Sequence, residues 1–307
     1  MSMKLYDMLA EHFPSERLMA NEPMRAHTTF RVGGNADVFF LPKDVQEVQT
    51  ALLLAKKANC PVTFIGRGSN LLVRDGGIRA LTVCFGEAFG GIRVEGNMII
   101  AGAGETLTHV SNVALENGLS GLEFASGIPG SVGGGMAMNA GAYGGELSSV
   151  TKWAYLMDSE TGEVRQYDVA HLQMGYRTSL ALKENKIVTG AAFCLTPGNK
   201  EDIKSKMDDF NRRRREKQPL NYPSAGSTFK RPEGHFAGAL IEQAGLKGTR
   251  VGGAEVSELH AGFIINRGDA TARDILDLIA LVTKRVYEHA GITLEPEVRI
   301  IGEEVMV

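Results

Sequence analysis

The sequence predicts an α+β protein with more than one compact part, on three observations. Helix-like and strand-like segments alternate up to about residue 85. Short strand-like segments then dominate between about residues 82 and 195, and amphipathic helical patterns return after residue 200. The 307 residues are also long for one hydrophobic core and suit two or three subdomains.

The composition is ordinary for a folded protein, with 43% hydrophobic residues, 22% charged residues and a net charge of −3. The charge does not indicate nucleic-acid binding, and no apolar run approaches the ~20 residues that span a bilayer. Residues 3–13 have the pattern of an amphipathic helix rather than of a signal peptide. Cys60, Cys84 and Cys194 stand far apart and are expected to be buried thiols of a reducing compartment. We therefore expect a cytoplasmic monomer that contacts neither membrane nor nucleic acid.

A helix is predicted early in the chain, from about residue 44 to residue 59. Asp44 and Glu47 have the spacing of a capping box. The apolar residues recur at helical spacing, at Val45, Val48, Leu52 and Ala55. Two short runs rich in β-branched residues then predict strands at 62–65 and 71–73.

Later segments predict further strands, separated by glycine-rich connections and helices. The expected strands cover residues 98–101, 153–157, 164–167, 187–195, 260–266 and 298–301, and helices are expected at 107–117 and 201–216. A last helix is expected between an N-cap at Thr271 and a stop at Gly291. Its core-facing positions are Ile275, Leu278, Ile279, Val282 and Val286.

The stretch from Gly127 to Gly145 is unusually rich in glycine, with eight glycines in nineteen residues. Each glycine weakens a helix or strand by about 0.5–1 kcal/mol relative to alanine, so this density needs a compensating reason. The usual reason is a tight bend that presents backbone N–H groups to a phosphate. Ordinary bulges and loop corners are the alternative explanation.

A second glycine-rich turn, Gly66-Arg67-Gly68-Ser69-Asn70, lies upstream between two predicted strands. It lacks the third glycine and the following helix of the dinucleotide fingerprint, and the chain has no Gly-Lys-Ser/Thr triplet of a nucleotide phosphate loop. Two such turns suggest one extended anionic cofactor that is held from two sides.

Two turn-like segments carry candidate reactive groups. Arg177 follows an aromatic residue, and its planar guanidinium can clamp a carboxylate. Ser227 follows Ala-Gly in a segment stiffened by Pro219 and Pro223. No Gly-x-Ser-x-Gly elbow or suitably placed histidine supports a nucleophile, so a reactive Ser227 would be a proton donor. A surface arginine and an ordinary turn serine are the simpler explanations of each residue taken alone.

Near the C-terminus, alternation along a strand places Glu297 and Arg299 on one face, after Pro296 has kept Glu295 extended. Alone, such a pair would be a surface ion pair worth at most about 1 kcal/mol. No histidine spacing indicates a metal site. The run Arg212–Arg215 is expected to be a solvated helix face, with attraction for substrate phosphates as its functional alternative.

Taken together, these segments resemble the UDP-N-acetylenolpyruvoylglucosamine reductases (the MurB family) of bacterial peptidoglycan synthesis. The resemblance covers about residues 21–301 and follows the family order. It is carried by His-Thr-Thr-Phe-Arg-Val-Gly-Gly (27–34), Gly-Arg-Gly-Ser-Asn-Leu-Leu-Val (66–73), Gly-Ile-Pro-Gly-Ser-Val-Gly-Gly (127–134), Met-Asn-Ala-Gly-Ala-Tyr-Gly (138–144), Tyr-Arg (176–177), Ala-Gly-Ser-Thr-Phe-Lys (225–230) and Glu-Pro-Glu-Val-Arg (295–299). The chain lacks an obvious inserted tyrosine loop and so resembles the shorter subtype.

The resemblance implies a two-lobed FAD-binding domain of the PCMH/vanillyl-alcohol-oxidase type and a C-terminal α+β substrate-binding domain. The implied boundaries are 1–85 with 292–307 for the first lobe, 86–204 for the second lobe and 205–291 for the substrate domain. It also implies an NADPH-dependent reaction through non-covalent FAD that converts UDP-N-acetylglucosamine enolpyruvate into UDP-N-acetylmuramate.

Site residues are implied by the same resemblance. Arg177 and Glu297 would stabilise the substrate enolate, and Ser227 would donate the proton. Glu297 can help only if it is protonated or tightly hydrogen-bonded, because a bare carboxylate would repel the enolate. The implied substrate contacts are Tyr176, Lys217, Lys230, Arg231 and Arg299. The implied FAD contacts are Gly66, Arg67, Gly68, Ser69, Asn70, Leu71, Ser126, Gly127, Pro129, Gly130, Ser131, Gly133, Gly134, Asn139, Ala140 and Gly141.

Two other functions fit the glycine turns. One is a flavin oxidase or dehydrogenase with a different substrate, although the turn at 66–70 lacks the histidine or cysteine that tethers the flavin in many such enzymes. The other is a non-catalytic module that binds a sugar nucleotide. Oxygen consumption would indicate the first, and a yellow purified protein would exclude the second.

Overall fold

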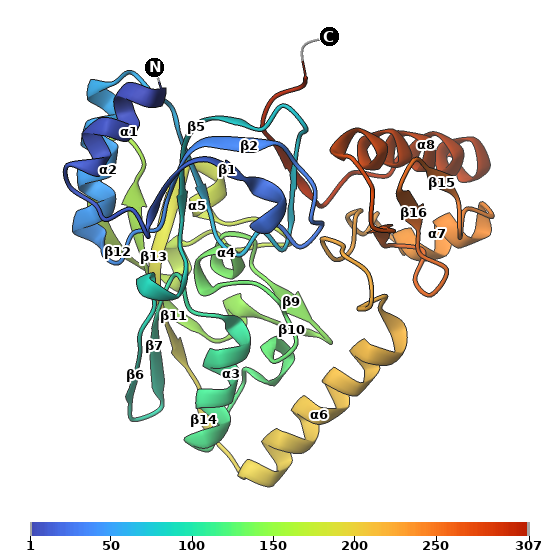
Figure 1. The fold of residues 1–307 in the computed structure, drawn as a ribbon. Coiled ribbons are helices and arrows are strands. Elements are labelled where there is room, and N and C mark those ends of the chain that lie inside the picture. The colour runs from blue at the N-terminus through green and yellow to red at the C-terminus, as the bar shows by residue number, and fades with distance from the viewer. Residues whose placement is uncertain (1, 306–307) are drawn as a thin grey trace. The chain divides into compact units, whose positions relative to one another are not determined.

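The computed structural model describes residues 2–305, which fold into helices and strands in mixed order (Figure 1). The chain forms two compact units. Unit 1 contains the residues up to Ala20, Val38–Arg67 and Ala80–Arg214, and unit 2 contains Asn21–Asp37, Gly68–Arg79 and the residues from Arg215 onward. The predicted α+β class is confirmed, whereas the three-part boundaries at 85, 204 and 292 stay a prediction.

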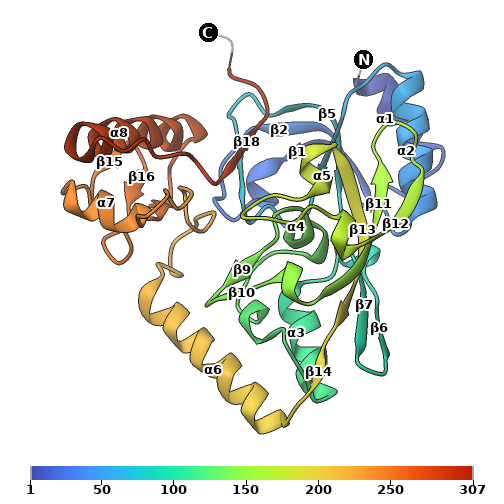
Figure 2. The same ribbon diagram turned by 180° about the vertical axis from the view of Figure 1, so that it is seen from behind.

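A five-stranded antiparallel sheet forms the centre of unit 1, in the order β12-β11-β13-β7-β6. Its strands are β6 (Ile92–Glu95), β7 (Met98–Gly102), β11 (Thr151–Asp158), β12 (Val164–Asp168) and β13 (Lys186–Cys194). Three helices share one apolar core with this sheet, namely α3 (Leu107–Glu116), α4 (Val132–Ala137) and α5 (Leu180–Lys183) (Figure 2). Short pairs lie beside them, β8 (Leu119–Ser120) with β14 (Thr196–Pro197) and β9 (Gly141–Ala142) with β10 (Gly145–Glu146).

A second core in unit 1 packs beneath two adjacent helices, α1 (Ser2–Ala10) and α2 (Val45–Lys57). The predicted N-cap of α2 is confirmed, because Asp44 accepts a hydrogen bond from the Glu47 amide. The capping box is not reciprocal, however. The Glu47 carboxylate accepts instead from the Lys43 amide at 2.9 Å and forms an ion pair with Arg17. The arginine thus draws the carboxylate away from the position that a capping box requires.

A four-stranded sheet has the order β1-β2-β5-β3. Its strands are β1 (Leu18–Pro23), β2 (Asn35–Phe40), β3 (Val62–Ile65) and β5 (Ile78–Cys84). The predicted strand at 62–65 is confirmed as β3, and it runs parallel to β5.

Unit 2 contains a three-stranded antiparallel sheet, β15 (Arg250–Val251), β16 (Ala254–Val256) and β17 (Ile264–Asn266), with helices α7 (Ala237–Gln243) and α8 (Ala272–Ala290). A parallel pair joins β4 (Leu71–Val73) to β18 (Arg299–Ile301). The prediction for α8 is confirmed in detail. Thr271 and Asp274 form a full capping box, the predicted stripe is buried, and Gly291 ends the helix with a left-handed φ of 70°.

Two sequence predictions placed element boundaries wrongly. The expected strand at 260–266 begins only at Ile264. The residues before it make a turn in which the Phe263 amide donates to the His260 carbonyl at 3.0 Å. The N-terminal helix ends at Ala10 rather than at residue 13, and the amides of His12 and Phe13 both donate to the Leu9 carbonyl in the turn that follows. Pro14 disfavours the helical conformation at Phe13.

The prediction of three buried cysteines is correct for Cys60 and Cys84 and wrong for Cys194, which is exposed at the end of β13. The sulfur of Cys194 accepts a 3.5 Å contact from the Asn97 amide. Among residues 2–305, no helix is long and apolar enough to cross a membrane, and no three histidine, cysteine, aspartate or glutamate side chains are grouped as metal ligands would be.

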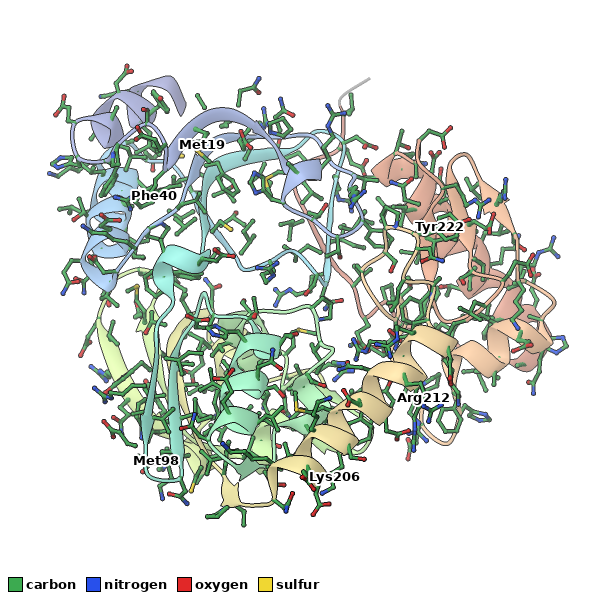
Figure 3. All side chains as sticks on the ribbon, turned by 60° about the horizontal axis from the view of Figure 1, so that its bottom comes forward. Met19, Phe40, Met98, Lys206, Arg212 and Tyr222 are labelled. Atoms are coloured by element: carbon green, nitrogen blue, oxygen red, sulfur yellow. The ribbon has the colours of Figure 1, made fainter. Side chains whose placement is uncertain are left out.

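The long helix α6 (Lys200–Lys217) is strongly polar, and Figure 3 marks its exposed Lys206 and Arg212. Arg212 and Arg213 pair with Asp209, as expected for a solvated face. Arg214 departs from this expectation, because its Nη1 donates to the Gly127 carbonyl. Its Nε is buried without a hydrogen-bond partner among the described residues.

Candidate functional site

Gly66, at the start of the first glycine-rich segment, meets the second segment within unit 1. A Cβ placed on Gly66 would lie 2.5 Å from the Oγ of Ser131, and one placed on Gly134 would lie 3.5 Å from the same atom. Only hydrogen at position 66 leaves the Ser131 hydroxyl in its place. This contact is compatible with one site served by two separate glycine turns, and that shared site stays a prediction.

The turn from residue 66 to residue 70 presents unused backbone donors. Within residues 2–305, the amides of these five residues donate to no protein acceptor. Gly68 has a φ of +63°, and a Cβ there would collide with the His27 carbonyl. Consecutive amides without internal acceptors form the kind of concave donor group that binds phosphate.

The second segment bends into the helix α4. Ser131 is 1% exposed and caps this helix, since its hydroxyl accepts from the Gly134 amide at 3.3 Å. A Cβ on Gly133 would lie 3.0 Å from the Ala103 Cβ, so the glycine permits close packing there. Upstream, Ser126 is buried and its hydroxyl donates to the Glu123 carbonyl, whereas Pro129 is exposed.

Asn139 was predicted as a cofactor contact, but its side chain is occupied by the protein. Its Nδ2 donates to the Gly175 carbonyl at 3.1 Å and its Oδ1 accepts from the Ser148 amide at 2.9 Å. The residue is 1% exposed and has a left-handed φ of 45°. Its neighbour Ala140 accepts from the Leu147 amide, and any contact of either residue with a cofactor stays a prediction.

Tyr176 and Arg177 occupy the two central positions of a tight turn in unit 1. The Gly175 amide donates to the Thr178 carbonyl at 3.0 Å, and the Thr178 amide returns the bond at 3.2 Å. Arg177 has a φ of 54°, which costs a non-glycine residue free energy and is often found at functional sites. Its guanidinium carbon lies 5.1 Å from the centre of the Tyr176 ring.

In unit 2, Ser227 and Glu297 belong to two segments that pair with each other. The Glu297 amide donates to the Thr228 carbonyl and the Lys230 amide donates to the Glu295 carbonyl, each at 2.8 Å. Ser227 is exposed, while its neighbour Thr228 is 1% exposed and accepts from the Ile264 amide. The backbone around Ser227 is therefore fixed while its hydroxyl stays accessible.

Asn70 connects the first glycine turn to these segments. Its Nδ2 donates to the Glu297 carbonyl at 3.2 Å, and its carbonyl accepts from the Arg299 amide at 2.9 Å. Leu71 and Arg299 are then opposite each other in the parallel pair of β4 and β18. Sequence reasoning did not predict this link, because the residues are more than two hundred positions apart.

The predicted substrate cations of unit 2 lie in different surroundings. Lys230 pairs with Glu295 at 3.0 Å, and both side chains are largely exposed. The guanidinium of Arg231 lies over the Phe236 ring, with its central carbon 4.0 Å from the ring centre. Lys217 and Arg299 are exposed, at the end of α6 and the start of β18.

The residues of the glycine turns fit an anionic dinucleotide such as FAD. Within unit 1, the amides of Gly66 and Arg67 and the buried Nε–H of Arg214, which lies beside Gly127, are donors without an acceptor among residues 2–305. Sequence reasoning missed Arg214, because an arginine within a run of four gives no local sign that one of them turns inward.

Comparisons with known proteins agree with this geometry. Residues 36–168 match the FAD binding domain family, and residues 218–301 match the C-terminal domain of UDP-N-acetylenolpyruvoylglucosamine reductase. The chain is 48% identical over 302 residues to the UDP-N-acetylenolpyruvoylglucosamine reductase of Alkaliphilus oremlandii (strain OhILAs), covering 98% of this chain and 99% of that protein. It is 49% identical to the same enzyme of Clostridium novyi (strain NT), covering 99% and 98%. The crystal structure of the Thermus caldophilus enzyme superimposes with a TM-score of 0.78 at 35% identity, covering 92% of this chain and 97% of that one.

The fold and the glycine turns thus define an FAD-binding oxidoreductase of the α+β class. The similarity extends over both the cofactor part and the C-terminal part of the relatives. The chain belongs to the UDP-N-acetylenolpyruvoylglucosamine reductase family.

Proposed function

We propose that this protein reduces UDP-N-acetylglucosamine enolpyruvate to UDP-N-acetylmuramate with NADPH, using bound FAD, in the synthesis of peptidoglycan precursors. The observation that carries the proposal is the similarity of nearly the whole chain to reductases of that name, together with the match to an FAD binding domain. The phosphate-binding geometry of the glycine turns is consistent with it.

FAD would be held by residues within the two glycine-rich segments, 66–71 and 126–141. The free amides of the first turn suit the diphosphate, whereas the amides of Val132, Gly133 and Gly134 at the start of α4 donate to protein acceptors. When bound, FAD carries the hydride equivalents between NADPH and the substrate. The absence of histidine and cysteine from residues 66–70 agrees with a non-covalent cofactor.

Arg177 is proposed to stabilise the charge that develops on the substrate. Reduction adds a hydride to the methylene carbon of the enolpyruvyl double bond and leaves negative charge on the adjacent carbon, delocalised into the carboxylate. A permanently charged guanidinium can hold this carboxylate through two parallel hydrogen bonds. Such preorganised charge is worth several kcal/mol in a water-poor site.

Ser227 is proposed to deliver the proton to that carbon, and Glu297 to stabilise the same enolate. A serine hydroxyl is a weak acid, but the carbanion is far more basic, so the transfer is downhill. The fixed backbone on either side of Ser227 supports this role, since a proton donor must be held within hydrogen-bond reach. Tyr176, Lys217, Lys230, Arg231 and Arg299 are proposed substrate contacts.

We also infer that the protein is a cytoplasmic monomer. Among residues 2–305, Cys60, Cys84 and Cys194 are in no disulfide, which agrees with a reducing compartment. The exposed large apolar side chains include Leu53 on α2, Tyr155 on β11 and Tyr287 on α8, which come from separate elements. Light scattering after gel filtration tests the monomer: a mass near 33.1 kDa supports it and twice that mass contradicts it.

The reaction is tested by product analysis in D₂O without oxygen. The purified holoprotein, NADPH and UDP-N-acetylglucosamine enolpyruvate should yield UDP-N-acetylmuramate with one deuterium on the carbon next to the carboxylate, because the proton delivered there comes from solvent. Oxygen consumption with a hydroxyl or amine substrate, and no such product, would instead indicate a flavin oxidase. A colourless protein that takes up no FAD would contradict the enzyme function altogether.

A further inference from the structure

Two buried side chains outside the proposed reaction tie the turn of Arg177 to the end of α4. Asn139 donates to the Gly175 carbonyl before the turn at 3.1 Å. Ser179, which follows the turn, donates from its hydroxyl to the Ala137 carbonyl at 2.8 Å. Both ends of the turn are therefore attached to one short segment at the C-terminus of α4.

Because Asn139 and Ser179 are buried, their two hydrogen bonds favour one position of the Arg177 turn. Asn139 is 1% exposed and Ser179 is 3% exposed, so water cannot easily replace either partner. The Ala137 carbonyl lies in the last turn of α4, where a helix leaves its carbonyl groups without intrahelical partners. The Ser179 hydroxyl supplies the missing donor.

Ser179 gives up a local hydrogen bond to do this. It occupies the N-cap position of α5, where a serine normally accepts from an amide of the first helical turn. Its side chain makes no such bond and reaches α4 instead. The long-range contact has thus replaced the usual local one.

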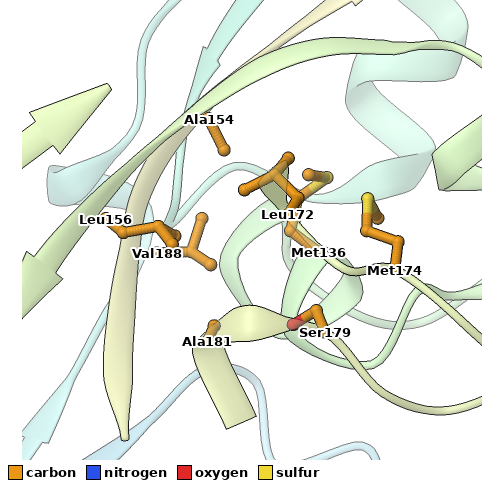
Figure 4. A pocket seen from close by; sticks show the side chains of 8 residues that line it. All are labelled: Met136, Ala154, Leu156, Leu172, Met174, Ser179, Ala181 and Val188. Atoms are coloured by element: carbon orange, nitrogen blue, oxygen red, sulfur yellow. The ribbon is translucent and has the colours of Figure 1, made fainter. Parts of the chain in front are cut away.

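Apolar packing around the turn is incomplete. Figure 4 shows a small cavity lined by Met174 and Ser179, which flank the turn, together with Met136 of α4 and side chains of β11 and β13. A side chain that borders a void lacks dispersion contacts on that side. The two hydrogen bonds therefore hold the turn at a place where the packing beside it is not complete.

We propose that Asn139 and Ser179 are positioning residues that hold the Arg177 turn in register with the glycine-rich loop leading into α4. This inference rests on the role proposed for Arg177. The same loop begins at residues proposed to hold FAD, so the two bonds couple the arginine to the cofactor-binding backbone within unit 1. It also assigns the Asn139 side chain to the protein rather than to the cofactor.

The first test compares Ser179→Ala with Ser111→Ala in the holoenzyme. Ser111 is a matched control, because its buried hydroxyl also donates to a carbonyl at 2.8 Å, that of Leu122, in the same core. Ser179→Ala should lower kcat/KM for the UDP substrate about tenfold, the effect of one buried hydrogen bond, and leave the rate of flavin bleaching by NADPH unchanged. Ser111→Ala should change neither rate. Equal losses in both variants would overturn the proposal.

A double-mutant cycle separates positioning from general damage. If Ser179 acts through Arg177, adding Ser179→Ala to Arg177→Ala should lower kcat/KM less than about twofold further. Multiplicative losses would overturn the proposal. If Arg177→Ala alone leaves kcat/KM unchanged, the role of Arg177 in the proposed function is wrong. Hydrogen exchange then decides separately whether Asn139 and Ser179 hold the turn in place.

Hydrogen exchange reports on the turn without reference to activity. The amides of Gly175 and Thr178 should exchange faster in Ser179→Ala and Asn139→Gly than in the wild type or Ser111→Ala. Glycine at position 139 keeps the left-handed backbone and removes only the side chain. Unchanged exchange would overturn the proposal. Weaker FAD binding by Asn139→Gly, with unchanged exchange, would establish Asn139 as the cofactor contact that the sequence predicted.

Discussion

At the scale of single residues, Ser227 is the group whose removal should affect chemistry most and folding least. Its side chain is exposed, whereas Thr228 beside it is buried and hydrogen-bonded. We expect Ser227→Ala to slow product formation about 10²- to 10⁴-fold, as loss of a positioned proton donor does. Bleaching of the flavin by NADPH should keep its wild-type rate in stopped-flow measurements.

Ser224→Ala, in the same segment, is the control and should keep both rates. Equal slowing of flavin bleaching and of product formation in Ser227→Ala would exclude Ser227 as the proton donor.

We expect Cys84 and Cys194 to differ in reactivity, because Cys84 is buried and Cys194 is exposed. Burial raises the pKa of the Cys84 thiol from 9.0 to about 12, although the charge of Arg67 acts in the opposite direction. Iodoacetamide at pH 8 should therefore modify exposed Cys194 and spare Cys84 in the folded protein, as peptide mass spectrometry can measure. Equal labelling of both thiols would contradict the buried environment of Cys84.

The raised pKa of Cys84 also makes the stability of the protein depend on pH. Because the pKa is higher in the folded state, this thiol contributes stability that is present below about pH 9 and is lost as the pH rises towards 12.

At the scale of elements, the first glycine turn should not tolerate a side chain at position 66. A Cβ there would lie 2.5 Å from the Ser131 hydroxyl, which caps α4. Gly66→Ala should lower the free energy of unfolding of the apoprotein by about 1–3 kcal/mol, as overpacking does, and weaken FAD binding in a fluorescence titration. In the control Gly86→Ala, the Cβ would meet only the flexible end of Leu41 at 3.4 Å. Wild-type FAD affinity in Gly66→Ala would contradict the proposed cofactor turn.

The N-terminus of α8 depends on a carboxylate from a distant loop. Asp75 accepts from the amides of Ala272 and Arg273, each at 2.9 Å, in addition to the Thr271 cap. Asp75→Ala should lower the free energy of unfolding by about 1.5–3 kcal/mol, since hydrogen bonds to a charged group are lost. Asp277→Ala removes only an exposed pair with Arg273 and should cost less than about 1 kcal/mol. Equal urea midpoints for the two variants would contradict this account.

Elements with strong local signals could be predicted from the sequence. The stripe and both ends of α8 follow from helical spacing, an N-cap threonine and a C-terminal glycine. The failures have local causes as well. The strand that ends at Asn266 starts late because a turn closes at Phe263, and Cys194 is exposed because it stands where β13 ends.

At the scale of the whole molecule, the pairing of distant segments could not be predicted from local patterns. Residues 228–230 pair with 295–297, and Asn70 bonds to Glu297 across 227 positions. Periodicity and capping describe neighbours within one element and contain no information on such partners. Local residue patterns singled out Arg177, Ser227 and Glu297, and the family resemblance gave them roles. The supporting bonds of Asn139 and Ser179 became visible only in the structure.

The central claim is that this chain passes reducing equivalents from NADPH to an enolpyruvyl ether of a UDP-sugar. The most direct measurement mixes the NADPH-reduced holoprotein with UDP-N-acetylglucosamine enolpyruvate in the absence of oxygen and follows the visible absorbance of the flavin. The yellow absorbance should return in a single turnover, with one UDP-N-acetylmuramate formed per flavin. A protein that binds FAD, is bleached by NADPH and then stays colourless with this substrate would contradict the claim.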